Sequence, residues 1–82
     1  MTEQPSDRYV IRDEERMMFI LFHLPRLDVA SVRWEVYSDE IMVQWEVDGK
    51  PEKFIRRLQA PIDPVQSGVD TVIDYISIRL FK

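Results

Sequence analysis

Two adjacent runs within residues 31–47, SVRWEVYSDEIMVQWEV, alternate apolar and polar side chains. Successive side chains of a β-strand point to opposite faces, so strict alternation is typical of a strand with one buried face. The apolar members occupy every second position of each run: Val32, Trp34, Val36, Ile41, Val43, Trp45 and Val47. We therefore predict a β-hairpin, and any fold for this chain has to bury one face of it.

The alternation also predicts which residues pair across this hairpin. With a loop at residues 38–39 or 37–40, the apolar side chains of both strands meet on one face, in the pairs Val36–Ile41, Trp34–Val43 and Val32–Trp45. A shift of one residue would turn the whole apolar set of one strand to water, so the register is well specified. Both tryptophans share this face and are predicted to lie in the core, with an exposed binding surface as the alternative. The loop itself lacks the Asn-Gly or Asp-Gly pair that favours a tight hairpin turn.

The rest of the chain has strand character interrupted by turn signals. Strands are predicted at residues 9–11, 16–24, 54–60, 69–73 and 75–81, with a connection at 25–30, a turn at 48–51 and a loop at 61–68. The run RMMFILFHL at residues 16–24 is almost wholly apolar and ends at Pro25. We predict a strand covered on both faces for much of its length, with a buried helix as the alternative, because short apolar runs are ambiguous.

This pattern of short strands, small loops and no long helix favours an all-β fold. The predicted fold class is an immunoglobulin-like antiparallel β-sandwich of six to eight short strands, and an open barrel would produce a similar pattern. At 82 residues the chain is one small domain, which we assign to residues 9–82. Residues 1–8 are polar and contain Pro5, so we expect a disordered or frayed tail.

Composition argues against several classes of partner. A net charge of −4 argues against nucleic acid, because phosphate binding requires a basic face. The absence of cysteine excludes disulfides, thiol chemistry and cysteine-ligated zinc. No stretch approaches the ~18 apolar residues of a membrane span, and the first ten residues do not resemble a signal peptide. We therefore expect a cytoplasmic protein whose partners are neither nucleic acid nor membrane.

Candidate catalytic and metal-binding residues are few. His23 is the sole histidine, and a metal site would need further His or Cys ligands, so we expect a structural histidine, packed or partly exposed. Paired carboxylates act as acid–base catalysts only inside a cleft, and the acidic residues at 13–15 and 39–40 flank predicted turns, so we expect them to be solvated. There is no Gly-rich phosphate loop. We expect a non-enzyme without metal or cofactor.

Several segments match a known domain in order and spacing. FILFHLPRLD at residues 19–28 is similar to an apolar strand with a Leu-Pro-Gly turn and an acidic residue, and residues 32–47 are similar to the hairpin that follows it. FIRRLQAP at residues 54–61 is similar to a Phe-x-Arg-x-aromatic-x-Leu-Pro strand. Residues 63–64 are similar to the Asp-Pro that often follows that strand, and residues 76–78 are similar to the apolar run of the last strand. Over residues 9–82 the chain resembles the α-crystallin domain of small heat-shock proteins and the related CS domain of co-chaperones.

The chain departs from this family pattern at three points. Arg26 replaces the glycine of the Leu-Pro-Gly turn, and Asp74 lies near a second family glycine. Residues 48–53 alone separate the hairpin from the next strand, where bacterial-type members have a long loop that crosses to a partner subunit. That swapped dimer is therefore not expected. The sequence Ile76-Ser77-Ile78 matches the tail motif of the family, but its place within the last strand predicts core packing.

The resemblance implies an ATP-independent chaperone, a holdase that binds unfolded or partly folded client proteins or a partner peptide. The implied client groove takes in Val32, Trp34, Val36, Val69, Thr71 and Ile73. Phe54, Arg56 and Leu58 are implied as an edge-strand contact, which could form a homodimer. The alternative is a solvated edge strand whose charged arginines prevent pairing with another strand. For the whole protein, the alternatives are a CS-like adaptor that binds one specific folded partner without general chaperone activity, and a structural domain of a longer protein.

Overall fold

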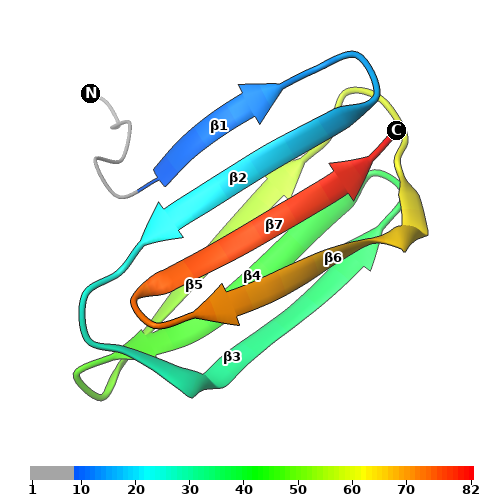
Figure 1. The fold of residues 1–82 in the computed structure, drawn as a ribbon. Helices are drawn as coiled ribbons and strands as arrows, with labels where there is room; N and C mark the ends of the chain where they lie inside the picture. The colour runs from blue at the N-terminus through cyan, green and yellow to red at the C-terminus, as the bar shows by residue number, and fades with distance from the viewer. Residues whose placement is uncertain (1–8) are drawn as a thin grey trace, which may run out of the picture.

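Seven β-strands and no helix make up the part of the chain that a computed structural model describes, residues 9–82 (Figure 1). The strands are β1 (Tyr9–Asp13), β2 (Met17–His23), β3 (Leu27–Tyr37), β4 (Glu40–Val47), β5 (Lys50–Arg57), β6 (Asp63–Val72) and β7 (Tyr75–Phe81). The tail predicted at residues 1–8 lies outside the described residues. In residues 9–82 no helix is present that could cross a membrane.

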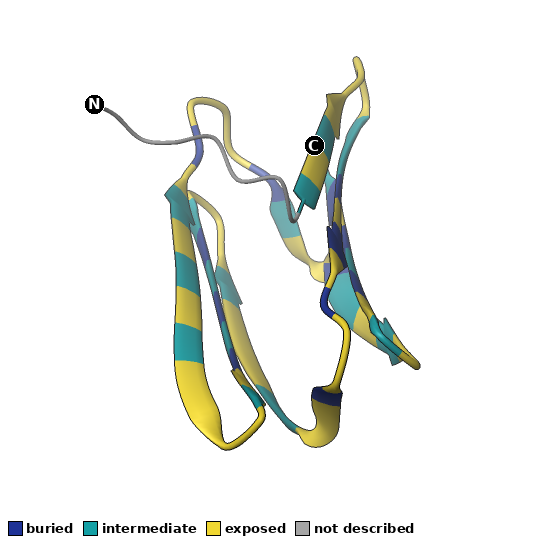
Figure 2. Ribbon diagram, turned by 90° about the vertical axis from the view of Figure 1, so that its left-hand side faces the viewer, coloured by how far each residue is buried: buried dark blue, intermediate teal, exposed yellow. Residues whose placement is uncertain are grey.

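The strands form two antiparallel sheets that face each other as a sandwich (Figure 1). One sheet has the order β1-β2-β7-β6 and the other the order β3-β4-β5. Buried and exposed residues alternate along several strands (Figure 2), because each sheet turns one face to the core and the other to solvent. The predicted antiparallel β-sandwich is therefore confirmed.

The core lies between the sheets. Its buried apolar residues are Ile20, Phe22, Leu24, Leu27, Ile41, Val43, Trp45, Leu58, Ile62, Ile76, Ile78 and Leu80. Removing such side chains from water contributes roughly 25 cal/mol per Å² of apolar area and is the main force that holds the sheets together. Ile76 and Ile78 are both fully buried, so the predicted core packing of the Ile76-Ser77-Ile78 stretch is confirmed for its two isoleucines.

The hairpin of β3 and β4 has the predicted register next to its loop. Val36 pairs with Ile41 and Trp34 with Val43, around a loop at residues 38–39. The third predicted pair, between residues 32 and 45, is not formed, because the register of β3 shifts between residues 28 and 33. Such a bulge leaves residues of one strand without a ladder partner and bends the strand.

The loop at residues 38–39 is stabilised from outside the hairpin. The backbone N–H of Leu58 donates to the carbonyl of Asp39 at 2.8 Å, and the N–H of Ile62 donates to the carbonyl of Ser38 at 2.9 Å. The segment between β5 and β6 therefore satisfies the loop's carbonyl groups. Neither Ser38 nor Asp39 has a positive φ, so this tight turn does not require glycine.

The turn between β4 and β5 contains two residues, Asp48 and Gly49, with φ of 53° and 77°. Two successive left-handed residues are the mark of a type I′ turn, which favours Asp-Gly. β5 therefore begins at Lys50, earlier than the predicted start at residue 54, and it ends at Arg57. It includes Pro51, which is tolerated because β5 is an edge strand.

β6 also begins earlier than predicted, within the expected loop at residues 61–68. Its ladder with β7 contains Asp63 and residues 68–72, and the register shifts between them. Ser67 lies in the shifted stretch and is buried, but its hydroxyl donates to the carbonyl of Asp63 at 2.7 Å and accepts from the N–H of Phe81 at 2.9 Å. Side-chain bonds thus replace part of the missing ladder.

β2 lies between β1 and β7, and the helical alternative for residues 16–24 is wrong. The inner side chains Ile20 and Phe22 are buried, but Leu21 and His23 on the outer face are exposed. Cover on both faces was predicted, and it is wrong for these outer positions. The reason is that neither sheet of residues 9–82 has a second layer on its outer side (Figure 2).

Candidate functional site

Each sheet of residues 9–82 ends in two strands that have an unpaired edge: β1 and β6 in one sheet, β3 and β5 in the other. β3 and β6 come together on one side of the sandwich (Figure 1). On the other side Tyr9 of β1 packs against Phe54 of β5, with ring centroids 5.4 Å apart. Open N–H and C=O groups on such edges can pair with an added strand. The two sites predicted from the sequence lie on these two sides.

The predicted client groove lies where β3 and β6 meet. Val32, Val36 and Val69 are half-buried and pack against the core, and Thr71 is half-buried as well. Trp34 is 43% exposed, and Ile73, in the turn after β6, is 78% exposed. The structure thus brings the groove residues of β3 close to those of β6 and the turn after it. Four of the six side chains lie at the rim of the core, and two are open to solvent. Client binding by these residues stays a prediction.

Trp34 and Trp45 differ in burial although both point to the inner face of their sheet. Trp45 lies on the central strand β4, is 4% exposed, and donates its indole N–H to Oε1 of Glu52 at 3.1 Å. Trp34 pairs with Val43 but lies on the edge strand β3. The predicted core position is therefore confirmed for Trp45 and wrong for Trp34, because an edge strand has a neighbour on one side only.

The predicted edge contact lies on β5, which is an edge strand as expected. Phe54 and Leu58 are not offered to a partner, because Leu58 is 8% exposed and the Phe54 ring lies 5.0 Å from that of Phe22. The outward side chains of β5 include Ile55 and Arg57, both exposed. A strand that paired with β5 would therefore contact its backbone, while Phe54 and Leu58 stayed in the core.

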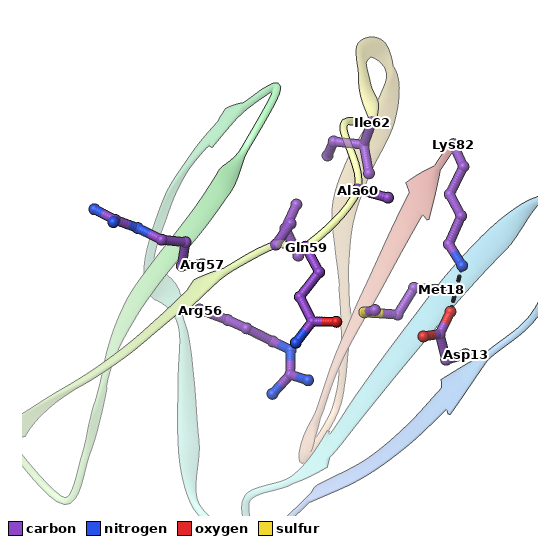
Figure 3. Close-up of a pocket in the computed structure, with 9 residues that line it drawn as sticks. Asp13, Met18, Arg56, Arg57, Gln59, Ala60, Ile62 and Lys82 are labelled. Carbon is purple, nitrogen blue, oxygen red and sulfur yellow. Dashed lines mark hydrogen bonds and ion pairs between the residues drawn. The ribbon is translucent and has the colours of Figure 1, made fainter.

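Arg56 points to a cavity of about 250 Å³ between the end of β5 and the opposite sheet (Figure 3). The cavity is lined by Asp13, Met18, Arg56, Arg57, Leu58, Gln59, Ala60, Ile62 and Lys82. Figure 3 shows Arg56 and Gln59 extending into the space between β5 and β2, whereas Arg57 extends away from it. On the far wall Lys82 donates to the carboxylate of Asp13.

Two features of the surface were missed from the sequence. One is this cavity, whose lining comes from three separate parts of the chain, residues 13–18, residues 56–62 and Lys82, which the topology brings together. The other is an apolar hollow of about 450 Å³ on the outer face of the four-stranded sheet, beside Phe19 and Leu21. The sequence does indicate this hollow, because β2 is apolar on both faces and a strand of a sandwich needs only one apolar face for the core.

His23 lies on the same outer face and stacks on Tyr75, with ring centroids 4.8 Å apart and planes inclined by 22°. It is exposed, as one form of the expected structural histidine would be. The described residues contain no group of three or more His, Cys, Asp or Glu side chains placed to hold a metal ion. The carboxylates at residues 13–15 are exposed to solvent, as expected for a turn.

No protein-family model and no curated protein matches this sequence. Solved structures match the fold, among them heat shock protein 16.0 from Schizosaccharomyces pombe, with a TM-score of 0.76 and 11% sequence identity. The superposition covers 96% of this chain and 88% of that one. This chain has an α-crystallin-like fold. The fold implied by the sequence resemblance is therefore confirmed. The two proteins share this fold although most of their residues differ.

Two departures from the family pattern, at Arg26 and Asp74, lie at positions with a backbone conformation that favours glycine. Arg26 and Asp74 have φ of 69° and 68°, in the left-handed region that glycine enters without strain. The third departure is more marked than predicted, because the β4–β5 connection is only the turn at residues 48–49. The α-crystallin-like fold is thus present here without a long loop at this position.

Proposed function

We propose that this protein is an ATP-independent chaperone of the small heat-shock type, a holdase that binds unfolded or partly folded client chains or a partner peptide. One observation carries the proposal: an α-crystallin-like sandwich presents a large apolar side chain, Trp34, on the open edge of β3 where it meets β6. The proposal includes a cytoplasmic location, a part in the stress response and a homodimer.

Binding at this edge follows from ordinary strand chemistry. An extended client segment that lies along β3 or β6 gains backbone hydrogen bonds from the open edge. Its apolar side chains remove Trp34 and Ile73 from water, and each large apolar side chain buried in this way contributes about 1.5–3 kcal/mol. Folded proteins keep such segments in their own cores, so the site favours clients that have lost their structure. Nothing in this scheme requires ATP.

A CS-like adaptor, which binds one specific folded partner, is the second candidate. It is favoured by the two-residue turn at Asp48 and Gly49, because a chain without a long loop at this point has no such arm to exchange with a second subunit. In the family that the sequence resembles, bacterial-type members form a swapped dimer through this loop. An adaptor would act as a single sandwich with one fixed partner.

The test is the aggregation of a heat-labile client protein, followed by light scattering at near-equal molar ratio without ATP. We expect the full chain to hold scattering down and Trp34→Ser to weaken this effect severalfold. Tyr37→Ser is the matched control, because Tyr37 is an exposed aromatic residue on the same strand but on the opposite face. No suppression by the full chain would contradict the holdase proposal, and a partner search by pull-down would then test the adaptor.

A further inference from the structure

The guanidinium of Arg56 has no partner of its own in the described part of the chain. It makes no ion pair and no hydrogen bond with any of residues 9–82, although the residue is half-buried at the mouth of the cavity between the sheets. A charge that is partly removed from water without a partner costs free energy. An anion that reached Arg56 would recover that loss, so the cavity favours a negatively charged ligand.

The balance of charge around the cavity agrees with this sign. Two cationic side chains, Arg56 and Lys82, face it against the single carboxylate of Asp13, while the side chain of Arg57 extends away from it. That carboxylate is already engaged, because Lys82 donates to it and also donates to the carbonyl of Glu14 at 2.7 Å. In a chain with a net charge of −4, this is a local excess of positive charge.

The walls of the cavity add a second requirement. Met18, Leu58 and Ile62 line it with apolar surface, while Gln59 extends into the same space as Arg56 and offers amide N–H donors (Figure 3). Guanidinium binds a carboxylate through two parallel hydrogen bonds, which gives the charged end of a ligand a fixed orientation. A volume of about 250 Å³ lies just below the ~300–1,000 Å³ of sites for drug-sized ligands, so the ligand is small.

We propose that this cavity binds a carboxylate carried on a short apolar group, with the carboxylate on Arg56 and Gln59 and the apolar group against Met18, Leu58 and Ile62. A free small organic acid and the terminal carboxylate of a peptide that ends in an apolar residue share this chemistry. The site lies on the opposite side of the sandwich from the proposed client groove. It does not depend on chaperone activity, so failure of the aggregation assay leaves it in place.

The experiment is a titration of the full chain with hexanoate, acetate and inorganic phosphate, followed by ¹H–¹⁵N NMR. We expect hexanoate to bind at least tenfold more tightly than either acetate or phosphate and to shift the resonances of Arg56, Gln59 and Met18. A short peptide that ends in a free leucine carboxylate, compared with its C-terminal amide, separates the two sources. Equal affinity for phosphate and hexanoate, or shifts confined to the outer-face hollow near Leu21, would overturn the proposal.

Two neighbouring arginines provide the matched variants. Arg56→Gln should weaken hexanoate binding at least tenfold, whereas Arg57→Gln, whose side chain extends away from the cavity, should change it less than twofold. If Arg56→Gln does not fold, Gln59→Glu replaces it as the test, because it places an internal carboxylate beside Arg56 that competes with the ligand. We expect Gln59→Glu to lower hexanoate affinity at least tenfold, and an unchanged affinity in the folded variant would overturn the site.

Discussion

The backbone N–H of Arg26 donates a hydrogen bond to Oδ1 of Asp74 at 3.2 Å, although 48 positions separate the two residues. The carbonyl of Asp74 accepts from the N–H of Leu24 at 2.7 Å, and the guanidinium of Arg26 donates to Oδ2 of Asp48 at 3.0 Å. Arg26 thus connects three turns, those after β2, β4 and β6. Arg26, Asp48 and Asp74 are also the non-glycine residues with positive φ in residues 9–82.

Arg26→Gly should be more stable than Arg26→Ala by about 0.5–1 kcal/mol. A left-handed φ costs a residue with a Cβ atom ~1–2 kcal/mol, and glycine avoids this cost. Glycine also raises the conformational entropy of the unfolded chain, which offsets part of the stability gained. Both variants lose the exposed ion pair with Asp48, which contributes ~0–1 kcal/mol, so their difference isolates the backbone conformation. Urea denaturation measures it. Equal stability of the two variants would contradict the predicted difference, and a more stable Arg26→Ala would show that φ at residue 26 carries no strain.

The alternation of side chains was enough to predict the sandwich and most of the central hairpin, because burial of one face determines the register. It was not enough to place Trp34. The pattern gives the face of a side chain, but its exposure depends on whether a neighbouring strand covers it, and strand order is a long-range property. The same holds for Arg56, whose strand was predicted while the cavity opposite it was not.

Turn chemistry explains the misplaced strand boundaries. The type I′ turn at residues 48–49 allows pairing to resume at Lys50, and Pro51 is accepted because β5 has an open edge. In β6 the bulge after Asp63 accommodates Pro64, so a proline that signals a loop lies inside a strand. Both boundaries depend on which edge of a strand is free, and a single sequence does not reveal that.

Ile78→Ala should destabilise the fold by about 2–5 kcal/mol. Ile78 is fully buried on β7, and truncation removes its transfer free energy and leaves a cavity. At ~0.05–0.15 kcal/mol per residue, an 82-residue chain has a total stability of roughly 4–12 kcal/mol, so the loss is a large part of it. Ser77→Ala, on the outer face of the same strand, should change stability by less than about 0.5 kcal/mol. Similar urea midpoints for the two variants would contradict the assignment of faces.

The titration of Tyr37 should depend on Glu35. The Tyr37 hydroxyl donates to Oε1 of Glu35 at 2.5 Å, and this bond, followed by the negative charge of Glu35, raises the pKa of Tyr37 above 10.0. Since the folded-state pKa is the higher one, the bond stabilises the fold below pH 10.0, and this contribution is lost as pH rises through the folded pKa. Glu35→Gln should therefore shift the NMR titration of the Tyr37 ring to lower pH. Glu46→Gln is the control, and an unchanged titration in Glu35→Gln would refute the coupling.

The backbone of β5 has a defined set of outward N–H groups. Val47 and Lys50 close a two-residue turn and so form a hydrogen-bonded pair, after which every second residue of β5 directs its N–H towards β4. The intervening residues direct theirs outward. Pro51, which has no N–H, occupies the first outward position, and Lys53 and Ile55 follow. The open edge of β5 therefore offers hydrogen bonds beyond Pro51.

Ile55→Pro tests whether a homodimer forms through this edge. The substitution removes one outward N–H and leaves the bonds to β4 in place, so a dimer that pairs β5 with β5 should dissociate at least tenfold more readily. Ile55→Ser is the control, because it makes the same exposed position polar and keeps the N–H. Mass measurement by analytical ultracentrifugation over a range of concentrations distinguishes the two. A dimer that survives Ile55→Pro unchanged would show that the subunits meet elsewhere, and a wild-type chain that stays monomeric would remove the homodimer from the proposed function.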